Sequence, residues 1–180
     1  MSKIRIDSHL IRENIETLDK HFRKHKKKWT LVTKVLAGNK HVLRSILDKK
    51  SIKKLHSVAD SRLSGLKTVK QINPEITTML IKPPSKYQIA NVIKYADISL
   101  NTSLKMIKAL NEEAYKAQKI HRIIIMIELG ELREGILKEN TVKFYSQVTQ
   151  LPNIEVLGIG TNLGCMYGVE PDHDKLMQLS

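Results

Sequence analysis

The chain has 180 residues, of which 41% are hydrophobic, and it carries a formal net charge of +13. This length and composition predict one globular domain and do not fit a disordered chain. No apolar run reaches the ~18 residues that a membrane-spanning helix needs, and the N-terminus lacks the apolar segment of a secretory signal, so we expect a cytoplasmic protein with no membrane partner. The single cysteine, Cys165, excludes an internal disulfide and a cysteine metal site, and the histidines lack zinc-site spacing, so we expect no metal.

The positive charge raises the question of nucleic-acid binding. Apart from the run "FRKHKKKW" at 22–29, the lysines are spread through every helical pattern, and aromatic residues make up only 4% of the chain. The aromatic residues do not alternate with the basic ones, so no platform for stacking bases is visible. The pattern favours a charged surface without a specific nucleic-acid partner. A basic module that binds nucleic acid is kept as a competing interpretation.

Short β-rich runs alternate with helical patterns along the chain. An amphipathic helix comes first, with Ile11, Ile15, Leu18 and Phe22 at helical spacing. Strands are predicted over 29–35, 52–59, 77–82, 96–100, 121–129 and 153–160. Helices are predicted over 41–50, 61–72 (capped by Asp60 or Ser61), 84–95 (opened by Pro84), from 104 onward (capped by Asn101, Thr102 or Ser103) and from 171 onward.

Six strands that are each followed by a helix predict a parallel α/β fold with right-handed crossovers. The polar residues of interest lie at or just past the C-terminal ends of these strands: Lys34, Asp60, Asn101, Arg133 and Asn162. In a barrel those ends meet at one mouth, whereas in an open sheet only the ends near a switch point would meet. We therefore expect a partial (β/α) TIM-type barrel of about six βα units, forming one incomplete domain over 1–180. A whole barrel takes eight units and ~250 residues, so we expect the chain to be part of a longer enzyme.

Lys34 is the first candidate functional residue, because it stands in the apolar run "LVTKVLAGN". Burial on a strand between Val32 and Leu36 would remove water from its ammonium group and depress its pKa, which makes the amine available as a nucleophile toward carbonyl groups. Such an amine can hold a ketone or a pyridoxal aldehyde as a Schiff base. The alternative is that Lys34 reaches solvent at the strand end or pairs with a carboxylate such as Glu128.

Two later segments also carry candidate residues. In "IELGELREG", Arg133 could bind an anionic oxygen of a ligand, or it could form a salt bridge with Glu128, Glu131 or Glu134. The loop "GIGTNLGCMYGVEPD" at 158–172 holds four of the eight glycines of the chain, which favours close approach of the backbone to a ligand. Thr161 and Asn162 offer hydrogen-bonding groups there. Cys165 of this loop is expected to be a small buried residue without a nucleophilic role.

With these segments in view, the whole chain resembles the N-terminal barrel of pyridoxal-phosphate enzymes of the alanine racemase type, closest to the ornithine racemase branch. The similar blocks are "IRIDSHLIRENI", "VTKVLAGN", "HSVADSRLSGL", "DISLNTSLKMIKAL", "IELGELREG" and "GIGTNLGCMYGV". The resemblance implies that Lys34 holds pyridoxal 5'-phosphate as a Schiff base and acts as an acid/base catalyst. It also implies cofactor binding by Arg133, near the phenolic oxygen, and by the Thr161 and Asn162 pair, near the pyridine ring.

The resemblance also implies what the substrate and assembly would be. The family's alanine racemases carry a tyrosine four residues after the lysine, where this chain has Gly38, which argues against alanine as the substrate. The resemblance to the ornithine racemase branch implies a basic amino acid such as ornithine. The last barrel units, the phosphate-binding loops and a C-terminal β domain with the second catalytic group would lie beyond Ser180. We therefore expect the 180 residues alone to bind cofactor weakly and not to racemise. Intact relatives are expected to form homodimers.

A competing interpretation is a pyridoxal-phosphate-binding homeostasis protein without catalytic activity, whose barrel shares the lysine strand. Such proteins usually carry a lysine or a serine-rich segment where this chain has "GELREG". Arg133 therefore favours the racemase.

Overall fold

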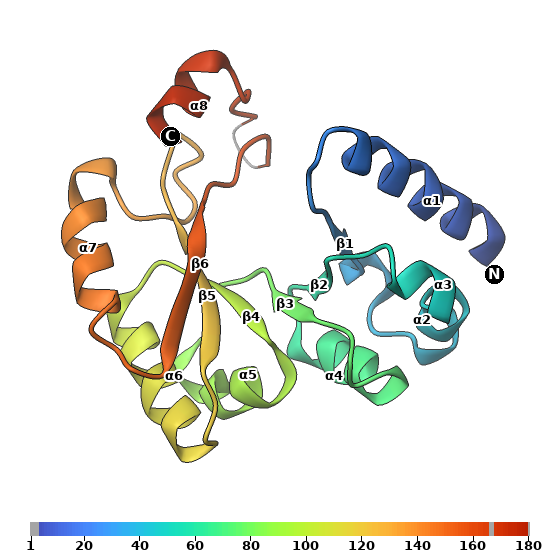
Figure 1. Ribbon diagram of the computed structural model, residues 1–180, viewed down its shortest axis with the longest axis horizontal. Helices are drawn as coiled ribbons and strands as arrows, with labels where there is room; N and C mark the ends of the chain where they lie inside the picture. Colours follow the sequence, from blue (N-terminus) through green and yellow to red (C-terminus); the bar gives the residue numbers. More distant parts are fainter. Residues whose placement is uncertain (1–3, 166–167, 180) are drawn as a thin grey trace. The chain divides into compact units, whose positions relative to one another are not determined.

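The computed structural model describes residues 4–165 and 168–179 (Figure 1). It contains two compact units, Met1–Met79 and Leu80–Ser180, which are described here one at a time. Each unit holds three strands, which follow the order of the sequence: β1-β2-β3 in the first and β4-β5-β6 in the second. Among the described residues, no helix is long and apolar enough to cross a membrane.

The first unit alternates short strands with helices. Its elements are α1 (Ser8–Lys24), β1 (Thr30–Val32), the 3₁₀ turn η1 (Lys34–Leu36), α2 (Lys40–Ile46), α3 (Lys49–Ile52), β2 (Ser57–Asp60), α4 (Leu63–Ile72) and β3 (Thr78–Leu80), whose last residue begins the second unit. Strands β1 and β2 pair in parallel, with Leu31 opposite Val58. Helices α2 and α4 supply Leu43, Ile46 and Val69 to a core that covers the Leu31 and Val58 face.

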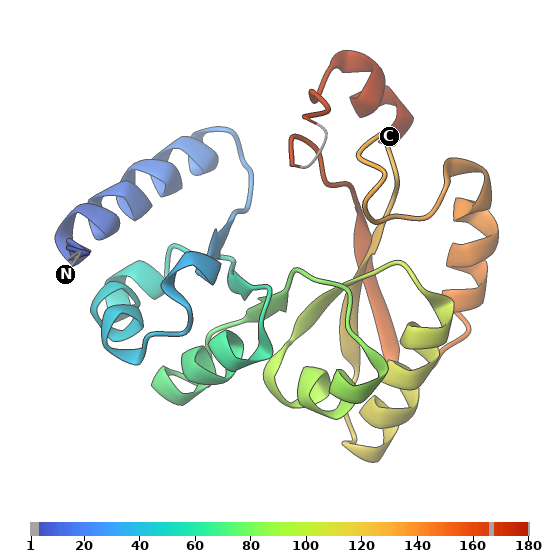
Figure 2. The same ribbon diagram turned by 180° about the vertical axis from the view of Figure 1, so that it is seen from behind.

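The second unit repeats this pattern with longer elements. They are η2 (Lys86–Gln88), α5 (Ile89–Tyr95), β4 (Ile98–Asn101), α6 (Leu104–Lys116), β5 (His121–Met126), η3 (Lys138–Asn140), α7 (Thr141–Val148), β6 (Ile154–Gly160) and α8 (His173–Leu179). Strand β5 pairs in parallel with both β4 and β6. Its Ile123 and Ile125 are fully buried against Ile107 of α6 and Val148 of α7. Helix α8 lies past the C-terminal end of β6 (Figure 2).

The predicted alternation of six strands with helices is confirmed, but several boundaries differ. The second strand begins at Ser57 and not at Ile52, because Ile52 closes α3. The helix predicted over 41–50 is two helices, since Asp48 begins a new one by accepting the backbone N–H of Ser51 at 2.7 Å.

The expected helix caps were only partly right. Helix α4 begins after Arg62, so neither Asp60 nor Ser61 is its N-cap. Ser103 does precede α6, as one of three expected residues, although its side chain forms no capping hydrogen bond. Pro84 does not begin a helix, because Ser85 and Gln88 form a capping box around η2 instead.

Candidate active site

Lys34 lies in a turn at the C-terminal end of β1 and not in the strand itself. The strand ends at Val32, and Lys34 begins η1, whose end at Ala37 is left-handed with φ 50°. Of the two alternatives for Lys34, burial on the strand and reaching solvent at the strand end, the second holds: its side chain is exposed, and the buried residue at the strand end is Thr33, 2% exposed. Among the described residues of the first unit, no hydrogen bond or ion pair is seen for the Lys34 ammonium group, whose side chain is exposed.

Arg133 lies in the loop that follows β5. Glu128 shapes this loop, because its Oε1 accepts the backbone N–H groups of Gly130 at 2.6 Å and Leu132 at 3.0 Å. Among the described residues, no ion pair is seen between Arg133 and Glu128 or Glu134, whereas Glu128 binds main-chain N–H groups. Its exposed guanidinium instead donates from Nη1 to Cys165 Sγ at 2.6 Å.

Thr161 and Asn162 directly follow β6 in the second unit. Thr161 Oγ1 and Asn162 Nδ2 are buried atoms with no hydrogen-bond partner in the described part of the chain. Buried polar groups are nearly always paired in folded proteins, so an unpaired donor and an unpaired hydroxyl side by side mark a place where a ligand can bind. Cys165, in the same loop, is exposed, which corrects the expectation that it is buried. Met166 and Tyr167 lie outside the described residues.

Glu131 joins the two loops, a role that sequence reasoning missed. It is 1% exposed, and its Oε1 accepts the backbone N–H groups of Cys165 at 3.0 Å and Val169 at 3.1 Å. A buried carboxylate that receives main-chain donors fixes the loop that carries them. The loop of Arg133 and the loop of Thr161 and Asn162 therefore lie together at one end of the second unit. Nothing in the sequence distinguished Glu131 from its acidic neighbours.

Asp60 and Asn101 do end their strands, as predicted, but both are buried. Asn101 is 1% exposed and donates from Nδ2 to Ser99 Oγ at 2.9 Å. It stands opposite Ile125, whose side chain packs against α6 and α7, so Asn101 lies on the helix-covered face of its sheet. We therefore assign Asn101 to the packing of the second unit and not to the candidate site.

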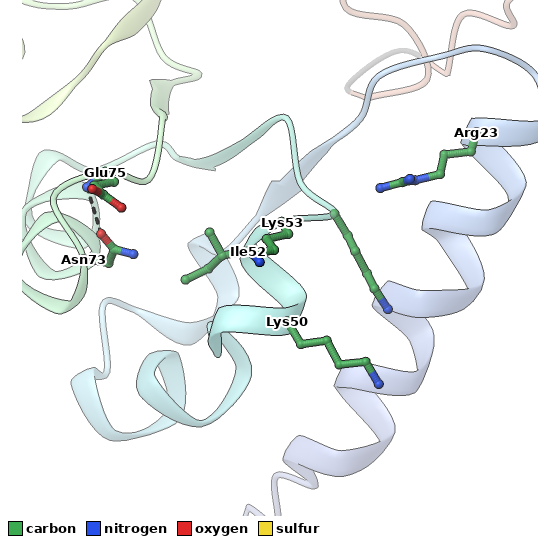
Figure 3. Close-up of a pocket in the computed structure, with 7 residues that line it drawn as sticks. Arg23, Lys50, Ile52, Lys53, Asn73 and Glu75 are labelled. Carbon is green, nitrogen blue, oxygen red and sulfur yellow. Dashed lines mark hydrogen bonds between the residues drawn. The ribbon is translucent and has the colours of Figure 1, made fainter.

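A pocket of about 680 Å³ in the first unit does not include any predicted site residue (Figure 3). It is lined by Arg23, Lys50, Ile52, Lys53, Lys54, Asn73 and Glu75. Most of its cations already have partners. Glu16 contacts Lys54 at 2.9 Å and Lys50 at 3.3 Å, and the hydrogen bond from Lys54 contributes most to lowering the pKa of Glu16. Asp19 binds Arg23 at 2.9 Å. The pocket is therefore a basic surface depression whose charge is largely balanced.

No group of three or more metal-ligating side chains lies together in the described part of the chain. Comparison with protein families gives a match to the N-terminal domain of alanine racemase over residues 6–180. The chain belongs to the alanine racemase N-terminal domain family. This membership agrees with the order of strands and helices in both units.

Individual relatives of this family member support the same assignment. The chain is 37% identical to the ornithine racemase of Acetoanaerobium sticklandii over 98% of its own length and 49% of the relative. It thus spans about half the length of this curated relative. The alanine racemase of Clostridium difficile 630 has a TM-score of 0.69 at 17% identity, covering 83% of this chain and 39% of that structure. PipY of Synechococcus elongatus PCC7942, with PLP bound, has a TM-score of 0.60 at 12% identity, and the match covers 75% of this chain and 63% of the PipY chain. These two structures share the fold.

Proposed function

We propose that this chain is the cofactor-binding part of a pyridoxal-phosphate-dependent racemase for a basic amino acid such as ornithine. One observation carries the proposal: the chain places an exposed lysine, whose amine has no partner among the described residues, in the turn that follows β1. The identity of 37% to an ornithine racemase over almost the whole chain supports the reaction and the substrate class. The racemase activity belongs to the proposal, because the chain spans 49% of that relative.

The side chains present fit pyridoxal 5'-phosphate. The cofactor supplies an aldehyde for covalent attachment and a ring that takes up electron density from the substrate. Lys34 would hold it through its free amine. The second unit offers its own groups for an anionic, polar ligand: the guanidinium of Arg133 is a donor for an anionic oxygen, and Thr161 Oγ1 and Asn162 Nδ2, which have no partner among the described residues, can bind further polar atoms.

Lys34 would have a second task once its amine is free of the cofactor. Racemisation requires removal of the α-proton on one face of the substrate and delivery on the other, and a positioned amine can perform one of these transfers.

The substrate proposal has a local structural argument at Gly38. Its φ is +72°, and a Cβ there would lie 3.3 Å from the Cα of Gly65. A tyrosine at this position, expected for an alanine racemase by resemblance, would be strained in backbone and crowded against α4. The turn therefore suits glycine, which supports a substrate other than alanine.

Trapping the cofactor on the chain tests the role of Lys34. The 180-residue chain is incubated with pyridoxal phosphate and reduced with borohydride, and mass spectrometry of peptides then locates the modified lysine. We expect the label on Lys34, and its loss in Lys34→Ala. The matched control is Lys40→Ala, which removes another exposed lysine only six residues away and should leave the label unchanged. Labelling of many lysines without preference would contradict the proposal.

Racemisation is measured by chiral chromatography after adding L-ornithine, L-lysine or L-alanine. The chain is assayed alone and fused to the part of Acetoanaerobium sticklandii ornithine racemase that follows the aligned region. We expect D-ornithine from the fusion, no activity in its Lys34→Ala variant, and less product from alanine. Selective labelling of Lys34 without turnover in the fusion would favour the alternative, a cofactor-binding protein without catalysis. Light scattering on the same samples tests the proposed homodimer.

A further inference from the structure

We propose that Arg62, held by the buried carboxylate of Asp60, is a positioning residue for Lys34. The inference rests on the proposed function of Lys34 and adds residues that the lysine depends on. It is carried by a set of contacts between two segments of the first unit: residues 33–38, which contain the Lys34 turn, and residues 58–65, which contain the end of β2 and the start of α4. We call these contacts the Lys34 clamp.

The direct contact of the clamp is a hydrogen bond from Arg62 to the backbone of Lys34. Nη2 of Arg62 donates to the carbonyl oxygen of Lys34. That carbonyl also accepts the N–H of Ala37 at 3.3 Å, so it is the acceptor that closes the 3₁₀ turn. A charged donor on this oxygen fixes the peptide plane that follows Lys34, and with it the direction in which the Lys34 side chain leaves the backbone.

Asp60 fixes Arg62 and the preceding strand end at the same time. It is fully buried; its Oδ1 accepts the backbone N–H of Arg62 at 2.9 Å and lies 3.7 Å from Arg62 Nε. Its Oδ2 lies 3.5 Å from Thr33 Oγ1, and Thr33 N–H donates to Ala59 at 2.8 Å. The residue before Lys34 and the residue that binds its carbonyl are therefore tied to one buried carboxylate.

Two glycines allow the segments of the clamp to approach this closely. A Cβ on Gly65 would lie 2.5 Å from Asp60 Oδ2, and a Cβ on Gly38 would lie 3.3 Å from the Cα of Gly65. Any larger residue at position 65 would displace the carboxylate. The close packing is specific to the Lys34 turn, because it brings the first turn of α4 against the end of η1.

The exposure of Arg62 separates a role in positioning Lys34 from a role in folding of the unit. The Arg62 side chain is about half exposed, 49%, so little hydrophobic burial depends on it. Its removal should therefore loosen residues 33–38 while the core of the first unit stays intact. A lysine whose carbonyl is no longer held would sample more directions and attack an aldehyde more slowly.

The test compares Arg62→Met, Arg62→Lys and Asp60→Asn with a matched control, Arg12→Met. Arg12 also donates a guanidinium N–H to a backbone carbonyl of the first unit, that of Ser45 at 2.5 Å. The first readout is amide hydrogen exchange of the cofactor-free chain, which needs no activity. The second is the rate of borohydride-trapped pyridoxal phosphate on Lys34, relative to that on Lys40 in the same sample.

We expect Arg62→Met to speed exchange of Leu36, Ala37 and Asn39 on the order of tenfold, and to slow labelling of Lys34 by a similar factor. Arg62→Lys should change the exchange and labelling rates less than Arg62→Met, because lysine keeps a charged donor. Asp60→Asn should change both rates in the same direction as Arg62→Met. Arg12→Met should speed exchange near Ser45 only.

Unchanged exchange at 36–39 in Arg62→Met would overturn the inference, as would faster exchange with unchanged labelling of Lys34. If the wild-type chain shows no preference for Lys34 over Lys40, the proposed function fails. In that case faster exchange in Arg62→Met still supports the clamp as a holder of this turn, so the two failures are distinguishable.

Discussion

His121 should make the stability of the chain depend on pH between about 4 and 6.5. It opens β5, is 4% exposed, and burial lowers its pKa from 6.5 to about 4 against an opposing attraction to Asp97. The nearby cations Arg122 and Lys119 lower the pKa further. Its Nε2 lies 2.8 Å from Ser99 Oγ.

The direction of the hydrogen bonds supports a neutral imidazole. Asn101 Nδ2 donates to Ser99 Oγ at 2.9 Å, which leaves the Ser99 hydroxyl hydrogen free to donate to His121 Nε2. Protonation would place a hydrogen on Nε2 and oppose this arrangement. The unfolded chain, by contrast, takes up the proton freely near the ordinary pKa.

The folded state therefore binds fewer protons than the unfolded state between these two pKa values, so stability falls as the pH falls. The contribution is fully present above pH 6.5 and is lost progressively as the pH falls toward about 4. The lowered pKa of His121 corresponds to a loss of about 3 kcal/mol in the free energy of unfolding from above the ordinary pKa to below the lowered one. Between about pH 7.5 and about pH 5 the loss is about 2 kcal/mol.

Urea unfolding of the wild type and His121→Gln, followed by circular dichroism at several pH values, measures this contribution. Glutamine keeps a polar group near Ser99 but does not titrate. The free-energy difference between the two proteins should shrink by about 2 kcal/mol from about pH 7.5 to about pH 5. His41→Gln, an exposed control, should change with pH like the wild type. Parallel curves for the wild type and His121→Gln would refute the reasoning.

Three further substitutions test the packing by urea unfolding at neutral pH. Gly65→Ala should lower the free energy of unfolding by about 1–3 kcal/mol, because the new Cβ meets the Asp60 carboxylate; no change would mean that the carboxylate can move aside. Ile123→Ala, at a fully buried position against α6 and α7, should cost about 2–5 kcal/mol, and a loss under 1 kcal/mol would contradict the core assignment. Asn39→Ala removes the N-cap bond to Val42 N–H at 3.1 Å and should cost about 1 kcal/mol, whereas Asn39→Asp should keep most of it.

Much of the fold could be predicted from local patterns. The apolar run at 121–129 predicted the central strand of the second unit, since a parallel strand covered by helices needs an apolar segment. The alternation with helical patterns predicted its neighbouring strands. The start of β2 could not be predicted, because Ile52 and Leu55 are apolar in either a helix or a strand. Residues up to Ile52 are helical because Asp48 begins a separate helix, α3, before the strand.

The members of the candidate site, Lys34, Arg133, Thr161 and Asn162, stay a prediction from the sequence, which placed them near the ends of the first, fifth and sixth strands. The sequence also identified the family through the order of its motifs. The surroundings of these residues came from residues distant in the chain. Glu131 is buried because the loop after β6 covers it and supplies two N–H donors.

Lys34 illustrates the division between sequence and tertiary structure. The sequence by itself determined that a lysine stands near the end of the first strand, because local alternation depends on neighbours in the chain, but it included Lys34 in the strand, which ends at Val32. Only the tertiary structure decided that this lysine is exposed while Thr33 beside it is buried. Burial depends on what packs from elsewhere in the chain, and here the buried Thr33 bonds to Ala59 and Asp60 at the end of β2, while the Lys34 side chain is exposed.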